Sequence, residues 1–218
     1  MSKLNPGILA IWNDCAAGTE GQYEHWYRSE HLAERVGVEG FVSGWRYAAV
    51  EAQPKYFTHY VTESTEVLFS PAYEERMNNP TALTTAIMSS VFLNCTRTIC
   101  ERVLRIGDSR GAFAAVARFV EAPDAGALAN GVQRIAEHDK VLRAELWTAA
   151  CAQTAQTSFA EVEIRGADDV IAACVIVETA DEDDARALMP SLNADTAGAA
   201  QIGIYRLMCA LQQGDQRE

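Results

Sequence analysis

The chain has 218 residues, of which 49% are hydrophobic and 22% are charged. This length suits one large domain or two small ones, and the apolar fraction excludes general disorder. The formal net charge of -12 argues against nucleic-acid partners and anionic membrane surfaces, because phosphate groups attract clustered lysine and arginine.

The first half of the chain predicts a strand, a helix, two strands, an interrupted helix and a long strand. Thr19 can cap the first helix and Gly37 can end it, while Asn78-Asn79-Pro80 interrupts the second helix. We interpret Thr81 as the N-cap of the helix that resumes there. The predicted ranges are Ile8–Asp14, Glu20–Val36, Gly40–Val50, Tyr56–Glu63, Ser70–Ser90 and Val91–Ile106.

The second half predicts the same order of elements, and residues Gln153–Gly166 give its weakest pattern. Its predicted ranges are Ala112–Glu121, Asp124–Glu137, Val141–Cys151, Val170–Thr179, Asp181–Leu192 and Gln201–Leu211. Each half therefore follows β-α-β-β-α-β, the ferredoxin-like order. The break falls near the polar, glycine-flanked segment Gly107–Gly111, which divides the chain into residues 1–109 and a divergent repeat at 110–218.

A four-stranded sheet with helices on one face leaves its other face bare, and that face must be buried. Two such units in one chain can bury both bare faces by packing sheet to sheet. The fold class that we predict is therefore α+β, with two tandem ferredoxin-like units forming an α+β barrel. Exposed sheet edges could still pair two copies into a homodimer.

The two halves differ in composition, which bears on where a site would lie. Residues 1–109 hold three of the four histidines, three of the four tryptophans and six of the seven tyrosines, whereas the second half is rich in alanine. Binding pockets use aromatic walls and a few convergent polar groups. We therefore place the site in residues 1–109 and interpret 110–218 mainly as scaffold.

The densest group of candidate site residues is on the first predicted helix. Steps of four residues place Tyr27, His31 and Arg35 on one stripe, with Trp26 and Glu30 on an adjacent one. His31 could act as general acid or base, with Glu30 or Glu34 orienting it. Arg35 could hold a carboxylate or an enolate oxygen.

Alternation along the predicted strands adds five further candidates. It places Trp12 and Asp14 on one face of the first strand, and Phe41, Ser43, Trp45 and Tyr47 on one face of the second, opposite Arg46. In the third strand, His59 and Tyr60 point to opposite faces. Asp14 and Arg46 fit a pocket or an internal ion pair equally well, and His59 fits a satisfied core histidine better than a catalytic one.

The sequence gives no pattern for a metal or for a common cofactor. His25 and His31 are six residues apart, which is poor spacing for joint ligation on one helical face, and His25 alone fits a surface group. Neither a Gly-x-Gly-x-x-Gly loop nor a Walker-type loop is present. We therefore expect neither a metal nor a cofactor.

The cysteines indicate a reducing compartment. The six cysteines, among them Cys151, include no Cys-x-x-Cys pair, and the start of the chain lacks the apolar stretch of a secretory signal. We expect reduced, mostly buried thiols in a cytoplasmic protein that has no membrane span.

The segment Trp12-x-Asp14, followed by His25-Trp26-Tyr27-x-x-Glu30-His31, Gly40-Phe41 and Arg46-Tyr47, resembles the dimeric α+β barrel superfamily, and within it the EthD-like proteins. Its members are usually half-length chains that dimerise, so this chain resembles a tandem fusion. The resemblance implies a cavity between helices and sheet for small aromatic or polyketide-like substrates. It also implies that His31 matches the helical histidine of EthD-like proteins.

Our leading hypothesis is a cofactor-free enzyme that acts on a small aromatic or enolisable compound by oxygenation, isomerisation or decarboxylation. His31 would be the general acid or base, Arg35 or Arg46 would stabilise an oxyanion, and Trp12, Trp26, Tyr27 and Tyr60 would form walls. The alternative is a non-catalytic protein that binds a small molecule or stabilises a partner. A third option is a haem-binding relative with His59 or His31 as axial ligand.

Overall fold

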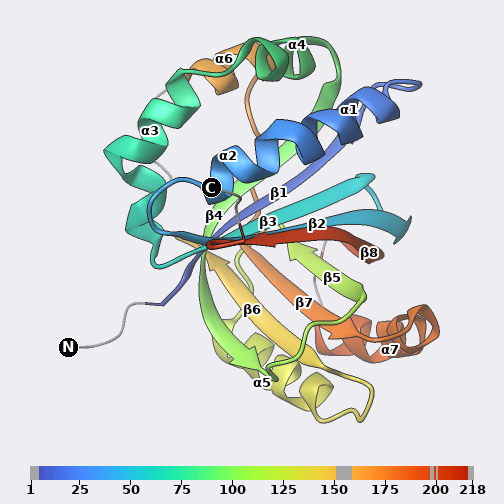
Figure 1. Cartoon of the computed structure of the whole chain (residues 1–218). Helices are drawn as coiled ribbons and strands as arrows, with labels where there is room; N and C mark the ends of the chain where they lie inside the picture. The colour runs from blue at the N-terminus through green and yellow to red at the C-terminus, as the bar shows by residue number, and fades with distance from the viewer. Residues whose placement is uncertain (1–4, 151–158, 197–198, 200, 216–218) are drawn as a thin grey trace.

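The structure is a computed structural model that describes residues 5–150, 159–196, 199 and 201–215. Its centre is a closed barrel of antiparallel strands in the order β1-β3-β2-β8-β5-β7-β6-β4 (Figure 1). The strands are β1 (Gly7–Cys15), β2 (Phe41–Glu51), β3 (Tyr56–Thr62), β4 (Phe92–Ile106), β5 (Phe113–Phe119), β6 (Arg143–Ala149), β7 (Ala173–Thr179) and β8 (Gln201–Gln212). Each predicted strand is present in the predicted order.

The predicted helices are also present, and two short elements are additional. The segment Glu20–Val36 is helical throughout, as α1 (Glu20–Trp26), a π-helical turn (Tyr27–His31) and α2 (Leu32–Val36). The other predicted helices are α3 (Pro71–Asn78), α4 (Ala82–Ser90), α5 (Ala125–Ala136) and α7 (Glu182–Asp195), and the additions are a 3-10 turn (Thr65–Phe69) and α6 (Ala160–Arg165). Thr81 caps α4, because its hydroxyl oxygen accepts the N–H of Thr84 at 3.0 Å.

Both faces are buried along most of β1, β3, β5 and β7, whereas alternate residues of β8 from Arg206 to Gln212 are exposed. Along β1, Trp12 lies in the core inside the barrel, whereas Leu9 and Ile11 pack under the helices. This confirms the alternation predicted for β1. In β2 the register shifts between Phe41 and Ser43, so Phe41 packs under the helices instead of sharing the inner face with Trp45. A local bulge of this kind reverses the direction of every side chain before it.

The two halves share one strand order and are joined at both seams. The first half reads β4-β1-β3-β2 and the second β8-β5-β7-β6, with β2 paired to β8 and β4 paired to β6. The described strands therefore leave no sheet edge free. The expectation that two copies could pair through exposed sheet edges is wrong for these strands.

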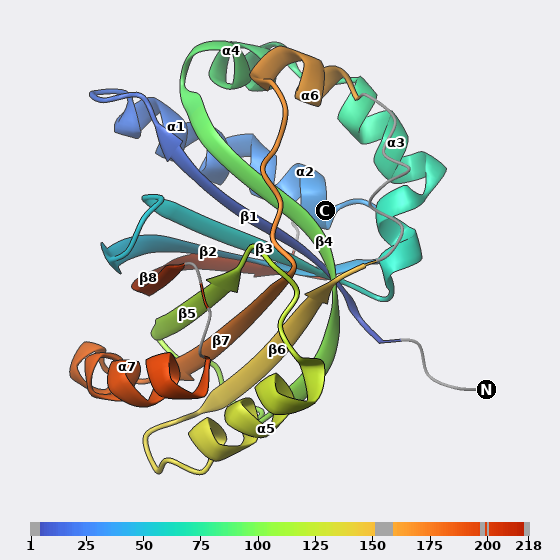
Figure 2. The same ribbon diagram turned by 180° about the vertical axis from the view of Figure 1, so that it is seen from behind.

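The helices form two outer layers that differ in origin. The layer over β5, β6 and β7 consists of α5 and α7, whereas the layer over the strands of the first half, β1 to β4, holds α1 to α4 (Figure 1). Helix α6 belongs to the second half of the chain, yet it packs against α3 and α4 (Figure 2). The amide of Ala160 donates to Oδ1 of Asn78 at 3.2 Å, which ties the start of α6 to the end of α3.

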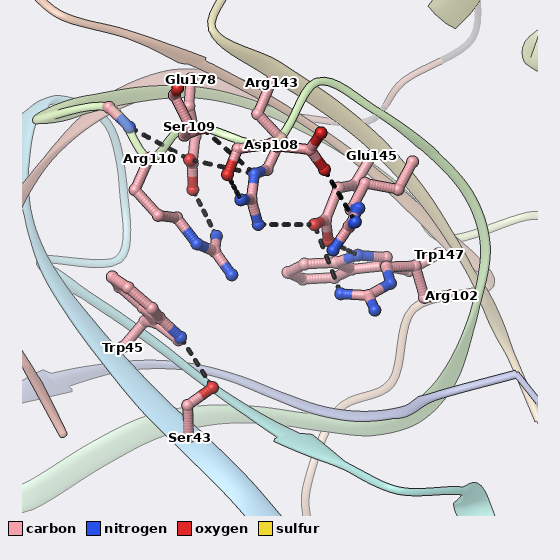
Figure 3. A network of polar contacts seen from close by, with 12 residues as sticks. Ser43, Trp45, Arg102, Asp108, Ser109, Arg110, Arg143, Glu145, Trp147 and Glu178 are labelled. Carbon is pink, nitrogen blue, oxygen red and sulfur yellow. Dashed lines mark hydrogen bonds and ion pairs between the residues drawn. The ribbon is translucent and has the colours of Figure 1, made fainter. Parts of the chain in front are cut away.

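A buried polar network fastens the segment that links the two halves, as Figure 3 shows. The Glu178 carboxylate accepts Nη1 of Arg110 at 2.6 Å and the amide of Gly111 at 3.2 Å. Nε of Arg143 donates to the Ser109 carbonyl at 3.2 Å. Since the Glu178 side chain has no exposed surface, it must be paired to be tolerated there.

We expect Glu178→Gln to lower the free energy of unfolding by about 3 kcal/mol, because removing one member of a buried ion pair leaves the other charge uncompensated. Urea unfolding monitored by circular dichroism measures the effect. The matched control is Asp183→Asn, which removes a 96% exposed carboxylate from an ion pair with Arg186 and should change the stability by less than about 0.5 kcal/mol. Equal effects of the two substitutions would contradict this role for Glu178.

Candidate functional site

A small cavity lies between the outer face of β1 and β4 and the helices that cover them. Its volume is about 20 Å³, which is room for about one water molecule. Apolar side chains form much of its wall, with several ionisable groups among them. It is lined by Leu9, Ile11, Tyr27, His31, Arg35, Tyr73, Met77, Met88, Phe92, Cys95, Arg97, Glu161 and Arg165.

The π-helical turn positions the histidine of this cavity. The amide of Leu32 donates to the carbonyl of Tyr27, five residues earlier, which inserts one extra residue into the turn. As a result, the Trp26 ring, predicted on a neighbouring stripe, lies against His31 with ring centroids 4.0 Å apart. Tyr27 meets His31 edge to face at 5.1 Å. The two aromatic rings hold the imidazole by packing.

Arg35 lies one turn beyond His31 and forms an ion pair with Glu161 of α6. The two side chains are only 3% and 4% exposed, so the pair is fully desolvated. Burial opposes the charge of Arg35, but the neighbouring Glu161 carboxylate outweighs it and keeps the pKa of Arg35 above its usual value. Nη1 of Arg35 is buried and has no hydrogen-bond partner among residues 5–150 and 159–196.

Two further arginines reach the cavity from other elements. Arg97 of β4 donates from Nη2 to the hydroxyl of Tyr73 at 3.0 Å. Arg165 at the end of α6 pairs with Asp168, which its Nε reaches at 3.0 Å. No carboxylate in the described part of the chain pairs with Arg97. The cavity and its immediate partners thus hold one more positive than negative charge.

The environment of the cavity sets the protonation of two groups that could react. Burial, with Arg35 and Arg165 nearby, lowers the pKa of His31 well below its usual value, so the ring is neutral at pH 7. Nδ1 of His31 is buried and finds no hydrogen-bond partner within the described chain. Burial also raises the pKa of Cys95 to about 12, which makes it a thiol rather than a nucleophilic thiolate.

The two acidic residues expected to orient His31 have other partners. Glu30 accepts hydrogen bonds from the hydroxyls of Thr81 and Thr84, and so fastens the first helix to α4. Glu34 pairs with Arg76 at 3.0 Å. The predicted orienting role is therefore wrong for both residues, because the π turn directs His31 toward aromatic rings instead.

Arg46 does not line the cavity. Its guanidinium donates to both carboxylate oxygens of Glu24, at 2.7 and 3.0 Å, and lies over the ring of Tyr27 at 4.2 Å. Of the two roles left open for Arg46, the structure shows the internal ion pair. It lies on the far side of Tyr27, which removes it as an oxyanion ligand in this cavity.

The strand residues Trp12 and His59 lie inside the barrel, on the opposite side of the sheet from His31. Trp12 stacks on Phe57 at 4.7 Å, and His59 lies 5.0 Å from the Trp147 ring. Trp12 was expected to form a wall beside His31, and the sheet separates the two. His59 lies in the core, as the favoured interpretation had it, but it is not satisfied there, because neither of its ring nitrogens has a hydrogen-bond partner within the described chain. Tyr60 points to the helical side with its hydroxyl buried, while its neighbour His59 points inward.

The remaining two candidates lie toward solvent. Asp14 accepts the amide of Lys55 at 2.7 Å and the side-chain amide of Asn94 at 2.9 Å, so it ties the turn between β2 and β3 to the start of β4. His25 is exposed on α1. Of the predicted site, the structure therefore brings together Tyr27, His31 and Arg35, with Trp26 behind them.

Sequence reasoning missed the residues that α6 contributes, Glu161 and Arg165. The second half was interpreted mainly as scaffold, and α6 corrects that interpretation because it completes the cavity wall. A weak signal exists in the apolar spacing of Phe159, Val162 and Ile164, all of which pack in the core under the helices. Such spacing predicts a short helix, but it does not indicate which layer the helix joins.

The described residues contain no group of three potential metal-ligating side chains. Their cysteines, Cys15, Cys95, Cys100, Cys174 and Cys209, are free thiols, and Cys151 lies outside the described residues. Among the described helices, none has both the length and the apolar character that crossing a membrane requires.

Comparison with solved structures shows that this fold is shared. An anthrone oxidase-like protein superposes with a TM-score of 0.61 at 10% identity, covering 99% of this chain and 96% of its own. A protein of Fusobacterium nucleatum provisionally named a monooxygenase gives 0.59 at 11% identity, with 98% and 96% covered. A heme-binding protein of Thermus thermophilus gives 0.50 at 8%, with 94% and 92% covered.

These neighbours are ferredoxin-like α+β barrel proteins, and identities near one residue in ten show a common fold and no more. No protein-family model matches the sequence. No curated protein matches it either.

The lowered pKa of His31 predicts a pH dependence of stability. The unfolded chain takes up a proton on this residue near its usual pKa of about 6.5, whereas the folded chain does not, so stability falls as the pH drops below that value. Between about pH 7.5 and 5.5, this protonation of the unfolded chain should cost the folded state up to roughly 1 kcal/mol. Urea unfolding of the wild type and of His31→Gln measures the difference between the two profiles.

In that experiment His31→Gln should flatten the profile by this amount. The exposed His25→Gln is the matched control and should retain the wild-type slope. Parallel profiles for wild type and His31→Gln would contradict a neutral, buried His31.

Proposed function

We propose that the protein is an enzyme that removes a proton from a small enolisable or phenolic compound in the cavity beside His31. The unprotonated ring nitrogen of His31 accepts the proton, and Nη1 of Arg35 donates to the oxygen on which the negative charge develops. Oxygenation of the resulting anion is the reaction that we favour, with isomerisation and decarboxylation as the other outcomes of the same first step.

The observation that carries this proposal is the pairing of two unsatisfied buried groups on one helix. A neutral histidine with a free Nδ1 and a guanidinium with a free Nη1 line the same cavity, one helical turn apart. Buried polar atoms without partners are uncommon, and they concentrate where a ligand supplies the missing partner. A base and an anion-stabilising cation are the two groups that proton abstraction beside a carbonyl requires.

The cations around His31 also explain how a weak base would act there. Burial, with Arg35 and Arg165 nearby, disfavours the imidazolium while the site holds no anionic ligand. When the substrate loses its proton, the new negative charge lies among these guanidiniums and favours both the anion and the protonated ring. Proton transfer is thus coupled to the presence of a substrate that can carry the charge.

The present cavity has room for water and not for a substrate, so binding requires the wall to move. Met77 of α3 and Met88 of α4 form part of that wall. Methionine side chains are unbranched and repack at low cost, which makes them suitable for admitting a flat ring. The oxygen-bearing edge of the ring would face Arg35, and its apolar face would contact Phe92.

If oxygen is the second reactant, its two atoms divide between the products. A methylene group of the substrate becomes a carbonyl, one oxygen atom enters that carbonyl, and the other leaves as water with the two methylene hydrogens. The substrate is oxidised and dioxygen is reduced. No residue of the chain changes its oxidation state in this scheme.

A haem does not fit the residues in this structure. The imidazole of His31 is packed against the rings of Trp26 and Tyr27, and the Arg35–Glu161 ion pair lies in the same cavity wall. His59 is closed in by Tyr47, Phe57 and Trp147 inside the barrel. Neither histidine has space beside it for a macrocycle, so no step of the proposed reaction uses one.

We also propose that the chain is a tandem fusion of two EthD-like, ferredoxin-like repeats, residues 1–109 and 110–218. The identical strand order of the two halves supports this division. The seams β2–β8 and β4–β6 would then take the place of the interface between two half-length chains. A homodimer of the whole chain and a cytoplasmic location stay predictions.

A second candidate function is non-catalytic binding of a small molecule. The observation that favours it is that Arg35 is closed off by Glu161 and Arg46 by Glu24, as a locked core would have them. It predicts saturable binding without any chemical change in the bound compound, and the same experiment distinguishes the two functions.

The proposal is tested by exchange of carbon-bound hydrogen with deuterated water, which reports proton abstraction whatever follows it. Anthrone and phenylpyruvate are the probes, because each has an acidic methylene group next to an aromatic system. Under nitrogen, mass spectrometry should show enzyme-dependent deuterium uptake, and His31→Gln should reduce its rate by about 10²–10⁴-fold.

The control for that substitution is His25→Gln, which changes an exposed histidine on the same helix and should leave the exchange rate as it is. Exchange that is equally fast with His31→Gln would contradict the role of His31. Binding of both probes without exchange would favour the non-catalytic function. Admitting air should then convert anthrone to anthraquinone if oxygenation follows.

A further inference from the structure

The carboxylate of Glu161 occupies one side of the Arg35 guanidinium inside the cavity. It reaches that position from α6, which belongs to the second half of the chain, across 126 residues of sequence. Apart from Glu161, the ionisable groups that line the cavity are histidine, arginine, tyrosine and cysteine. Among the described residues, the single acidic group in the lining is therefore supplied by a separate short helix.

The balance of charge shows what this carboxylate does there. Asp168 neutralises Arg165, and Glu161 neutralises Arg35, whereas Arg97 has only the Tyr73 hydroxyl as its partner in the described chain. Without Glu161, two buried guanidiniums would face the same space uncompensated. Guanidinium groups bind carboxylates through two parallel hydrogen bonds, so this space is suited to an organic anion.

A buried ion pair is also a poor way to stabilise a fold, since desolvation of both charges offsets much of their attraction. Here the pair uses only Nη2 of Arg35, and Nη1 finds no partner among the residues that the structure describes. A ligand that offers a carboxylate together with a second oxygen would satisfy both nitrogens, which Glu161 does not.

Resting on the proposed function, we infer that the substrate of this cavity is an aromatic acid whose carboxylate replaces that of Glu161 on Arg35. The Glu161 carboxylate then neutralises Arg35 in the empty site, and the carboxylate of the substrate displaces it. The neighbouring enolate or phenolate oxygen of the substrate takes Nη1. This assigns the ligand class by its charge as well as by its acidic hydrogen.

Helix α6 is placed to release Glu161 without disturbing the barrel. It has only the residues Ala160–Arg165, and its main contacts are with α3 and α4. Its buried attachments are the side chains of Glu161 and Arg165, and Phe159, Val162 and Ile164 pack against the core under the helices. Replacing the Arg35 contact by a ligand contact therefore changes one outer layer of the molecule.

The test measures binding of benzoate, an aromatic carboxylate without an acidic methylene, by titration calorimetry. Glu161→Gln keeps the size of the side chain and removes its charge, so benzoate should bind this variant at least tenfold more tightly than the wild type. Benzamide has the same shape without the charge, and it should gain nothing. The matched control is Glu74→Gln, which removes a carboxylate from the exposed face of α3 and should bind benzoate as the wild type does.

The double variant Arg35→Gln/Glu161→Gln identifies Arg35 as the group that holds the anion. It removes both charges of the pair, so no charge is left uncompensated there, and it should lose the tight benzoate binding. If Glu161→Gln is too unstable for calorimetry, its melting temperature should rise with benzoate and stay unchanged with benzamide. Equal benzoate affinity of Glu161→Gln and the wild type, or equal gains for benzamide, would overturn the inference.

These outcomes are separate from those of the exchange experiment. Benzoate binding to Glu161→Gln without deuterium exchange into any probe would support the anion site and contradict the enzyme. Exchange into anthrone, which has no carboxylate, together with unchanged benzoate affinity would support the enzyme and contradict the acid as its substrate.

Discussion

Each strand of the barrel has two faces to bury, and the arrangement of the molecule follows from that constraint. Strand β1 shows it most directly, with Trp12 inside the barrel and Leu9 under the helices. A single four-stranded sheet with helices on one side would leave the inner residues in water. Closing two such sheets through β2–β8 and β4–β6 buries both inner faces and pairs all the edges at once. The outer faces are then the only places where a layer can be opened without breaking the barrel.

Closure of the barrel and its helical layers also buries polar side chains. Some of them have all their hydrogen-bond partners, and others do not. At the link between the halves, Glu178 and Arg110 are paired and anchored to backbone, so the network fixes one conformation. In the cavity, His31 and Arg35 keep atoms without partners. Fully satisfied groups stabilise a fold, whereas unsatisfied ones favour whatever ligand can complete them. Unpartnered atoms also occur outside the cavity, on both ring nitrogens of His59 inside the barrel for example, so what marks the candidate site is that a neutral base and a guanidinium with such atoms line one cavity.

Hydrophobic periodicity was sufficient to predict the order of elements in both halves, because each strand and helix carries its own repeat. It also placed Tyr27, His31 and Arg35 on one stripe. It could not anticipate the bulge that turns Phe41 outward or the π turn that brings Trp26 to His31. Each of these features adds one residue to a strand or to a helical turn, and the pattern of apolar residues around it does not show where. The partner of Arg35 was out of reach for a different reason: Glu161 meets it through tertiary packing, and no local pattern encodes a contact between distant segments. Alternation predicted that His59 and Tyr60 point to opposite faces of β3. Which of the two faces lies inside the barrel follows only from the closed sheet.

The two outer layers show why one side of the barrel is suited to a site. The layer formed by α5 and α7 is packed with aliphatic side chains such as Leu128, Val132 and Leu192, which fill the space against β5, β6 and β7. The opposite layer mixes aliphatic side chains with many aromatic rings and two methionines, and rings leave gaps unless each meets another. Helix α6 contributes Glu161 to the wall of the cavity in this layer, so a segment of the second half completes the wall around residues of the first. The mixed layer is therefore the one in which the proposed reaction would move the wall, because its methionines repack at low cost and part of its cover is one short helix.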